Sequence, residues 1–142
     1  MKFLLDTQAF LWFVLKDRAL SQVACDLIVD PLNDILLSPA SYWEIAIKVS
    51  IGKYQIPGNF VTWMEHQIQV NELEILPIKV AHAAAIVTLP FHHKDPFDRL
   101  LVAQALTEKI PIISVDAALD NFQSLVIGKY NNLRSTAVRS HC

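Results

Sequence analysis

The chain has 142 residues, of which 53% are hydrophobic and 18% are charged, so it can bury a core, and wholesale disorder is excluded. Its formal charge of −2 excludes nucleic-acid binding driven by bulk positive charge, so such binding needs local basic patches or a metal ion. We expect a single domain over residues 1–127, followed by a polar C-terminal tail over residues 128–142 whose order the sequence does not predict.

Neither a membrane segment nor a disulfide framework is evident. No apolar run is long enough to span a bilayer, and MKFLLDTQAF reaches an acid at position six, too early for a signal peptide. We therefore expect a cytoplasmic protein with no membrane association. The two cysteines, Cys25 and Cys142, have neither zinc-site nor redox-motif spacing, and Cys25 is expected to be a small buried residue.

The first half of the chain predicts strands and helices in alternation. Short apolar runs over residues 2–5 and 34–38 are typical of buried strands. Helices are predicted over residues 7–16, over residues 21–30 with Ser21 as the N-cap, and from residue 38 to near Gly52.

The second half continues this alternation. Helices are predicted over residues 61–70, 79–89, 96–109 and 117–122, and strands over residues 73–78, 111–115 and 124–127. The chain has only three glycines and no internal repeat, which argues against a loop-rich all-β fold. Short strands that alternate with helices predict an α/β fold in which a mainly parallel sheet lies between helices.

Two of the predicted strands are followed by an aspartate, Asp6 and Asp116. The carboxyl ends of parallel strands lie on one edge of the sheet, where α/β folds place their binding sites. Each aspartate alone is more simply explained as the N-cap of the next helix. The two roles are compatible, because both belong to the strand-to-helix turn.

A third acid lies in the segment KDPFDRLLVAQAL. Asp95 followed by proline is typical of a helix start, and Asp98 falls in the first turn, where an acid interacts favourably with the helix dipole. This structural explanation is sufficient for both residues. However, Asp98 also heads an apolar stripe at helical spacing, formed by Leu101, Val102, Ala105 and Leu106. An acid at the edge of a buried face usually has a partner.

Glu44 is the one acid in SPASYWEIAIK, a helical segment that is otherwise mostly apolar. It shares a helix face with Ala40, Ile47 and Ile51, so this helix is expected to turn a carboxylate inward. The simpler explanation is an ion pair with Lys48, four residues on, which contributes about 0.3–0.5 kcal/mol. The sequence is compatible with both explanations.

The four acids could therefore converge at one edge of the sheet. Two carboxylates about 4 Å apart repel by about 4 kcal/mol at an effective dielectric constant of about 20. Such a cluster needs raised pKa values or a cation, and all-oxygen ligands suit Mg²⁺ or Mn²⁺ rather than zinc. The reaction that such a site supports is metal-assisted hydrolysis of a phosphodiester by an activated water.

These segments together resemble the PIN-domain family, in particular the VapC-like toxins of bacterial toxin–antitoxin pairs. The matching segments follow the order of the family and cover most of the chain from residue 2 to about residue 122. They are FLLDTQAFLW, SPASYWEIAIKVSIGK, LPFHHKDPFDRLLVAQAL and SVD. Two departures are Gln8, where close relatives often have histidine, and the polar ending NNLRSTAVRSHC.

The resemblance implies a three-layer α/β/α sandwich and an endoribonuclease that dimerises and is silenced by a cognate antitoxin. It also implies that a quartet of acids binds Mg²⁺ or Mn²⁺, namely Asp6, Glu44, Asp98 and Asp116. Ser114 stands where the family commonly has threonine and would support Asp116 by a hydrogen bond. Asp95 is a second supporting residue.

Basic residues beside these acids are candidates for binding an RNA phosphate. Lys94 and Arg99 flank Asp98 together with His92 and His93, and Lys48 lies on the helix of Glu44. Ordinary solvated charge explains them equally well.

Three alternatives differ in chemistry. An aspartyl phosphatase needs a second aspartate two residues after the nucleophile, but position 8 is glutamine. A response-regulator-like receiver has no use for a glutamate at the position of Glu44. A non-cleaving PIN domain that binds RNA or a protein is the third alternative, and the presence of all four acids argues against it.

Overall fold

The computed structural model describes residues 1–90, 95–115 and 126–127, the last two as backbone only. The helix predicted over residues 117–122 and the tail over residues 128–142 lie outside these ranges, as does Asp116. The fold is α/β, as the sequence predicts.

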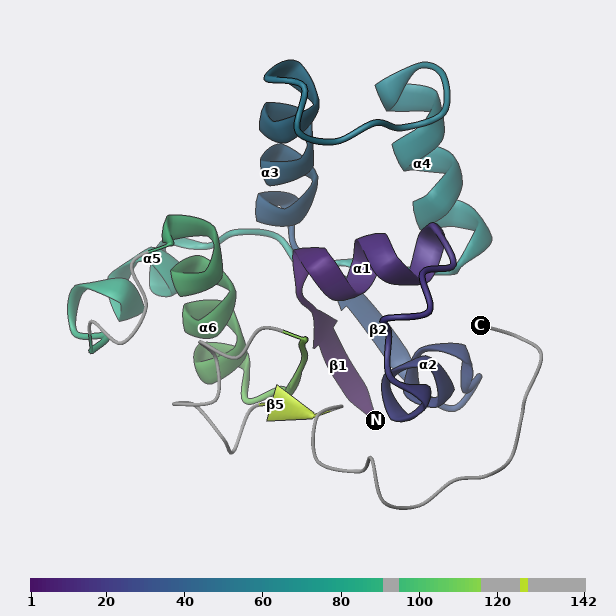
Figure 1. The fold of residues 1–142 in the computed structure, drawn as a ribbon. Coiled ribbons are helices and arrows are strands. Elements are labelled where there is room, and N and C mark those ends of the chain that lie inside the picture. The colour runs from purple at the N-terminus through teal and green to yellow at the C-terminus, as the bar shows by residue number, and fades with distance from the viewer. Residues whose placement is uncertain (91–94, 116–125, 128–142) are drawn as a thin grey trace.

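All the strand pairings described are parallel. The strands are β1 (Lys2–Leu5), β2 (Asp34–Leu37), β3 (Glu74–Ile75), β4 (Ile112–Ile113) and β5 (Val126–Ile127). They lie in the order β3-β2-β1-β4-β5, so β1 is central (Figure 1). Leu4 of β1 pairs with Leu36 of β2 and with Ile112 of β4, which brings the carboxyl ends of three strands to one edge.

The helices found in the described residues agree with the predicted segments. They are α1 (Thr7–Val14), α2 (Gln22–Val29), α3 (Pro39–Ser50), α4 (Phe60–Val70), α5 (Val80–Val87) and α6 (Pro96–Glu108). None of these is long and apolar enough to cross a membrane.

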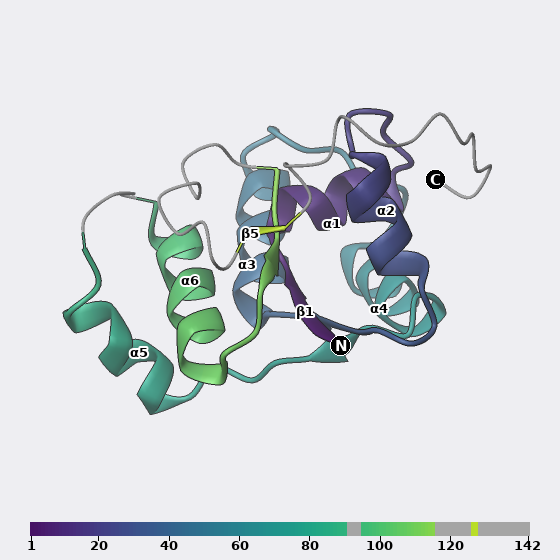
Figure 2. The same cartoon turned by 90° about the horizontal axis from the view of Figure 1, so that it is seen from below.

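The sheet separates two apolar layers, which makes the fold a three-layer α/β/α sandwich. Phe3 and Leu5 face one side and pack with residues of α1, α2, α3 and α4, whereas Leu4 faces the other side and packs with α6. This alternation follows from the two-residue period of a strand. Figure 2 shows α5 and α6 on one side of β1 and α2 and α4 on the other. Each fully buried leucine or isoleucine contributes about 1.5–3 kcal/mol to stability.

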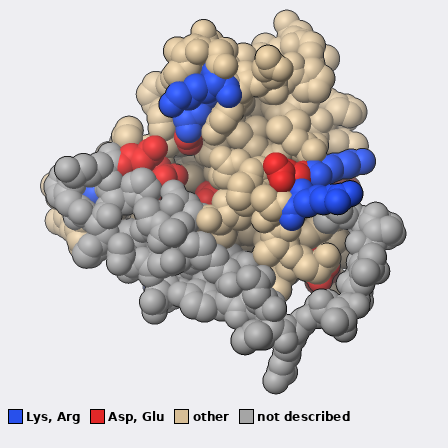
Figure 3. Space-filling model, in the orientation of Figure 1, with Lys and Arg blue, Asp and Glu red and all other residues tan. Residues whose placement is uncertain are grey.

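The turns that follow β1 and β2 run directly into helices with side-chain caps. Asp6 accepts a hydrogen bond of 2.6 Å from the backbone N–H of Ala9, and Ser38 accepts one of 3.1 Å from that of Ala40. These bonds satisfy helix N–H groups that have no partner within the helix. The caps place α1 and α3 over the same edge of the sheet. Acidic side chains gather on this face of the molecule, over the N-terminal end of α6 (Figure 3).

The buried stripes differ from the prediction at three positions. Ile47 and Ile51 are exposed on α3, whose inward face is formed instead by Ala40, Ser41, Glu44 and Ile45. Leu106 is also exposed, whereas Leu101, Val102 and Ala105 of the predicted α6 stripe are buried. On α3 the buried face is rotated from the predicted stripe toward Ser41 and Ile45, and on α6 it extends instead to Arg99, Ala103 and Gln104. The neighbouring elements, rather than the apolar spacing, decide which side of each helix is covered.

The side chain of Arg99 connects the start of α6 to the end of α5 by hydrogen bonds. Its guanidinium donates hydrogen bonds to the carbonyl oxygens of Ile86, Leu89 and Pro90, at 3.4, 3.5 and 3.3 Å. These carbonyls lie at and beyond the C-terminal turn of α5, where a cation also interacts favourably with the helix dipole. The side chain is buried, so these bonds are not in competition with bulk water.

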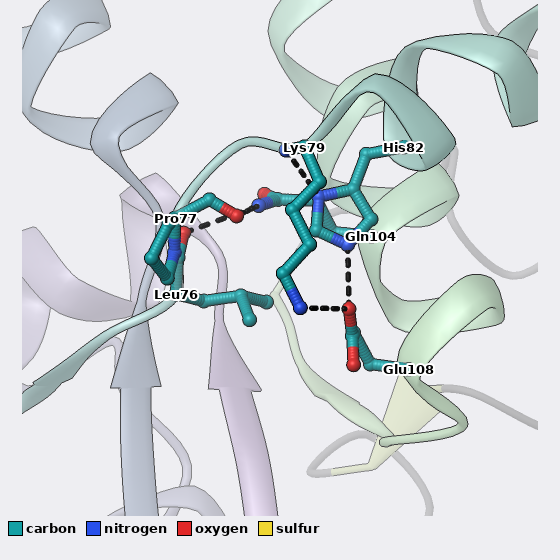
Figure 4. A network of polar contacts seen from close by, with 6 residues as sticks. All are labelled: Leu76, Pro77, Lys79, His82, Gln104 and Glu108. Carbon is teal, nitrogen blue, oxygen red and sulfur yellow. Dashed lines mark hydrogen bonds and ion pairs between the residues drawn. The ribbon is translucent and has the colours of Figure 1, made fainter.

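A second polar network joins the other end of α6 to the segment that leads into α5 (Figure 4). The buried His82 accepts a hydrogen bond at Nδ1 from the backbone N–H of Lys79 (3.0 Å), so its Nε2–H donates to Glu108 (2.7 Å). Gln104 donates to the carbonyl oxygens of Leu76 (3.2 Å) and Pro77 (3.4 Å). His82 therefore has a structural role.

We expect Arg99→Gln to lower the free energy of unfolding by about 1–3 kcal/mol, because buried carbonyl oxygens lose their donors. Arg99→Lys should lower the free energy of unfolding by less, since the lysine ammonium can still reach some of these carbonyl oxygens. Urea unfolding at pH 7 measures both, with Arg18→Gln, at an exposed position, as the control. Wild-type stability of Arg99→Gln would show that these hydrogen bonds contribute nothing.

The pH dependence of stability should reveal the His82–Glu108 contact. The hydrogen bond from His82 is the largest cause that lowers the pKa of Glu108 below its ordinary value of 4.5, and Lys79 adds to it. A carboxyl group whose pKa is lower in the folded state stabilises the fold at pH values above its unfolded-state pKa. This contribution is lost as the pH falls through its folded-state pKa. We therefore expect the stability difference between wild type and Glu108→Gln to be constant from pH 7 to pH 5 and to shrink below about pH 4.5. Urea unfolding of both proteins across this range tests it, and a difference independent of pH contradicts it.

Candidate functional site

The carboxyl edge of the sheet is lined by polar residues that directly follow three neighbouring strands. Asp6 follows β1, Ser38 follows β2 and Ser114 follows β4, and all three are buried. Ser114 donates a hydrogen bond of 2.5 Å to Oδ2 of Asp6, whose Oδ1 accepts from the N–H of Ala9. Charge-assisted bonds of this kind hold a buried carboxylate in one orientation. Asp6 is therefore held in one orientation at the end of β1.

Glu44 lies on the buried face of α3, so the inward carboxylate that the sequence predicts is present. Its side chain is only 7% exposed, and its Oε2 lies 2.6 Å from Nζ of Lys48. Its Oε1 is buried and has no hydrogen-bond partner among the described residues. The ion pair predicted from the spacing is thus present, but it is not a surface pair. It satisfies one oxygen of a buried carboxylate and leaves the other open.

Lys48 lies between Glu44 and Tyr54. Its ammonium is 3.5 Å from the hydroxyl of Tyr54 and 5.3 Å from the centre of the tyrosine ring. Partial burial acts to lower the pKa of Lys48, but the hydrogen bond and charge of Glu44 outweigh it, with help from Tyr54, so the pKa is raised. Lys48 is therefore a cation at neutral pH, held beside the open carboxylate.

Asp95 and Asp98 mark the first turn of α6. Asp95 is the N-cap, because its Oδ1 accepts hydrogen bonds from the backbone N–H groups of Phe97 (2.8 Å) and Asp98 (3.2 Å). This cap confirms the helix start predicted from Asp95 and Pro96, whereas the supporting role of Asp95 at a metal site stays a prediction. The half-buried side chain of Asp98 is not needed as a cap.

Two contacts hold the three acid-bearing elements together. Thr7 of α1 donates a hydrogen bond of 3.0 Å to Ser41 of α3, and both side chains are buried. Trp43 of α3 packs edge-to-face on Phe97 of α6, with ring centres 5.4 Å apart. Each of these four residues lies next to Asp6, Glu44 or Asp98 in the chain, or within one helical turn of one of them. In Figure 3, basic atoms lie next to acidic atoms on this face of the molecule.

The described acids do not complete a metal site by themselves. Within residues 1–90 and 95–115, no three histidine, cysteine or acidic side chains form a group that could hold a metal ion. Asp116, the fourth predicted ligand, lies outside the described residues, so the convergence of the four acids stays a prediction. The support of Asp116 by Ser114 also stays a prediction, since the hydrogen bond seen from Ser114 goes to Asp6.

The predicted RNA-phosphate candidates have different surroundings. Lys94 lies outside the described residues. Arg99 is buried, and its guanidinium faces the carbonyl oxygens at the end of α5, so its visible contacts are structural. Lys48 is 28% exposed and adjoins Glu44, so of the two described candidates it is the more open to solvent.

Sequence reasoning missed the hydrogen bond between Thr7 and Ser41. The available signal is that both hydroxyls follow shortly after strand ends, in stretches that otherwise bury apolar residues. A polar residue kept at such a place needs a hydrogen-bond partner. The distance between the two helices could not be read from that signal.

The same arrangement of elements occurs in a known protein. The chain matches the fold of VapBC2 from Rickettsia felis, solved bound to a DNA fragment from their promoter, with a TM-score of 0.67 and 15% sequence identity. The match covers 89% of this chain and 96% of the other. A search of curated protein sequences gives no match.

The sequence itself matches the family described as PIN domain over residues 3–125. This range contains the strand-end Asp6, the buried Glu44, Asp98 at the start of α6, and Asp116. It covers far more than half of the chain, so the match defines the family of the whole domain rather than of a single motif. The chain belongs to the PIN-domain family.

Proposed function

We propose that this protein is an endoribonuclease that depends on Mg²⁺ or Mn²⁺ and acts in the cytoplasm as the toxin of a toxin–antitoxin pair. The observation that carries this proposal is the buried Glu44, whose Oε1 has no hydrogen-bond partner in the described part of the chain. An unsatisfied buried carboxylate oxygen costs about 1–3 kcal/mol, and a cation bound there would recover that cost.

The donor set fits a hard divalent ion. Asp6, Glu44, Asp98 and Asp116 would hold it, and all four supply only carboxylate oxygens, which Mg²⁺ and Mn²⁺ prefer. When bound, the ion supplies a Lewis acid that activates water and stabilises negative charge during phosphodiester hydrolysis.

The chain's own residues prepare this site. Ser114 and the N–H of Ala9 orient the carboxylate of Asp6, and Asp95 fixes the start of the helix that carries Asp98. Lys48 is a cation at the rim, where it would contact an RNA phosphate. The part of the chain that the structure describes shows no convincing side-chain nucleophile at this edge, so we assign the attack to water.

Partners belong to the same proposal. The fold is shared with a VapBC2 assembly, which supports a cognate antitoxin as a binding partner. We also propose a homodimer. Exposed apolar side chains such as Trp43, at 60% exposure, support a protein–protein contact on this molecule.

The test is cleavage of a mixed pool of structured RNAs with Mn²⁺, with Mg²⁺ and with EDTA. Asp98→Asn should reduce metal-dependent cleavage by at least about 100-fold, since losing even a supporting partner of a metal ligand costs about 10- to 100-fold. It should keep the fold, and its melting temperature in EDTA should equal or exceed that of wild type, because repulsion between carboxylates is relieved.

Glu108→Gln is the matched control, because it removes an acid from the far end of the same helix. It should cleave like wild type in every condition. An unchanged rate for Asp98→Asn would overturn the site assignment. Binding of RNA by wild type without cleavage under any condition would favour instead a PIN domain that acts as a binding module.

A further inference from the structure

We propose that Lys48 is an internal counter-ion for Glu44 that competes with the divalent ion, so that metal binding releases the lysine toward an RNA phosphate. This inference rests on the proposed function for its RNA step. Its metal step concerns only the chain and the ion.

The first support is the incomplete satisfaction of Glu44. Its side chain is only 7% exposed to solvent. Lys48 nevertheless bonds to only one of its two carboxylate oxygens. The contact of 2.6 Å between Nζ and Oε2 is short, as expected for a charge-assisted bond. A buried carboxylate with one cation and one open oxygen is suited to exchanging its partner for a stronger one.

The second support is that Glu44 is not the sole partner of Lys48. Tyr54 presents its hydroxyl 3.5 Å from the ammonium and its ring centre at 5.3 Å, within the range of a cation–π contact. Tyr54 follows the turn at Gly52, whose φ of 78° reverses the chain after α3. The lysine can therefore leave Glu44 without losing every favourable contact.

The third support is the direction of the electrostatic change. A divalent ion on Glu44 would turn the attraction that holds Lys48 into repulsion between two cations. The lysine is 28% exposed on a flexible stem, so it can move outward. There it would contribute a cation to phosphate binding only after the metal has bound. Lys48 would thus weaken metal binding when no RNA is present. Once the metal has bound, it would strengthen the binding of RNA.

The first experiment measures Mn²⁺ binding by isothermal titration calorimetry in the absence of RNA. We expect Lys48→Met, which keeps the length of the side chain but not its charge, to bind Mn²⁺ about 3- to 30-fold more tightly than wild type. Lys48→Arg keeps the charge and should stay close to wild type. Lys53→Met removes an exposed lysine five residues on and should also leave the affinity unchanged.

Thermal unfolding gives a second readout that does not depend on activity. In EDTA, Lys48→Met should melt below wild type, because Glu44 has lost its cation. Saturating Mn²⁺ should raise its melting temperature by more than it raises that of wild type. Equal or weaker Mn²⁺ affinity for Lys48→Met, or no Mn²⁺ binding by the wild type, would overturn the proposal.

The RNA step is tested separately, at saturating Mn²⁺, with the same RNA pool. Lys48→Met should raise KM severalfold while kcat changes less, since the lost cation binds phosphate rather than the metal. An unchanged KM together with tighter Mn²⁺ binding would refute the RNA step and retain the counter-ion. Absence of cleavage by wild type would refute the nuclease, whereas the calorimetric result would still decide the role of Lys48.

Discussion

The candidate site depends on the hydrogen bond from Ser114 to Asp6, which joins strand ends 108 residues apart in the chain. It forms only because β1 and β4 are parallel neighbours in register, so that the residue after each strand reaches the same edge. The same parallel pairing brings Ser38 to this edge from β2. The position of Glu44 follows in turn, because Ser38 caps the helix that carries it.

The buried polar residues of the described chain fall into two groups with different tasks. One group lies around the carboxyl edge of the sheet and comprises Asp6, Thr7, Ser38, Ser41, Glu44 and Ser114. The other consists of His82, Arg99 and Gln104, which join α5 and α6 to each other and to the segment after β3. Each group contains one buried oxygen without a partner, on Glu44 and on Gln104. Only the first belongs to a carboxylate, and only it therefore calls for a cation.

The sequence predicted the fold well where the signal is local. Asp6 and Asp95 are N-caps as expected, and the described helices and strands overlap the predicted segments, because caps and apolar periodicity act over a few residues. The prediction was wrong for Ile47, Ile51 and Leu106, because helical spacing identifies an apolar stripe but not which part of the helix surface the neighbouring elements cover. The contacts of Arg99 could not be predicted for a related reason: its acceptors lie 9 to 13 residues earlier, and the approach of α6 to the end of α5 is a tertiary feature.

The Glu44–Lys48 pair shows why spacing alone cannot separate a structural role from a functional one. The sequence offers an i, i+4 pair of small energetic value or an inward carboxylate, and the structure contains both at once. What decides between their consequences is burial, because an exposed pair is screened by water and contributes little. A pair in which the acid is buried and the base is half-exposed is asymmetric: the acid cannot leave, whereas the base can. Because of this asymmetry, Lys48 is the partner of Glu44 that another cation can replace. The net charge at the carboxyl edge of the sheet then depends on which cation is bound to Glu44.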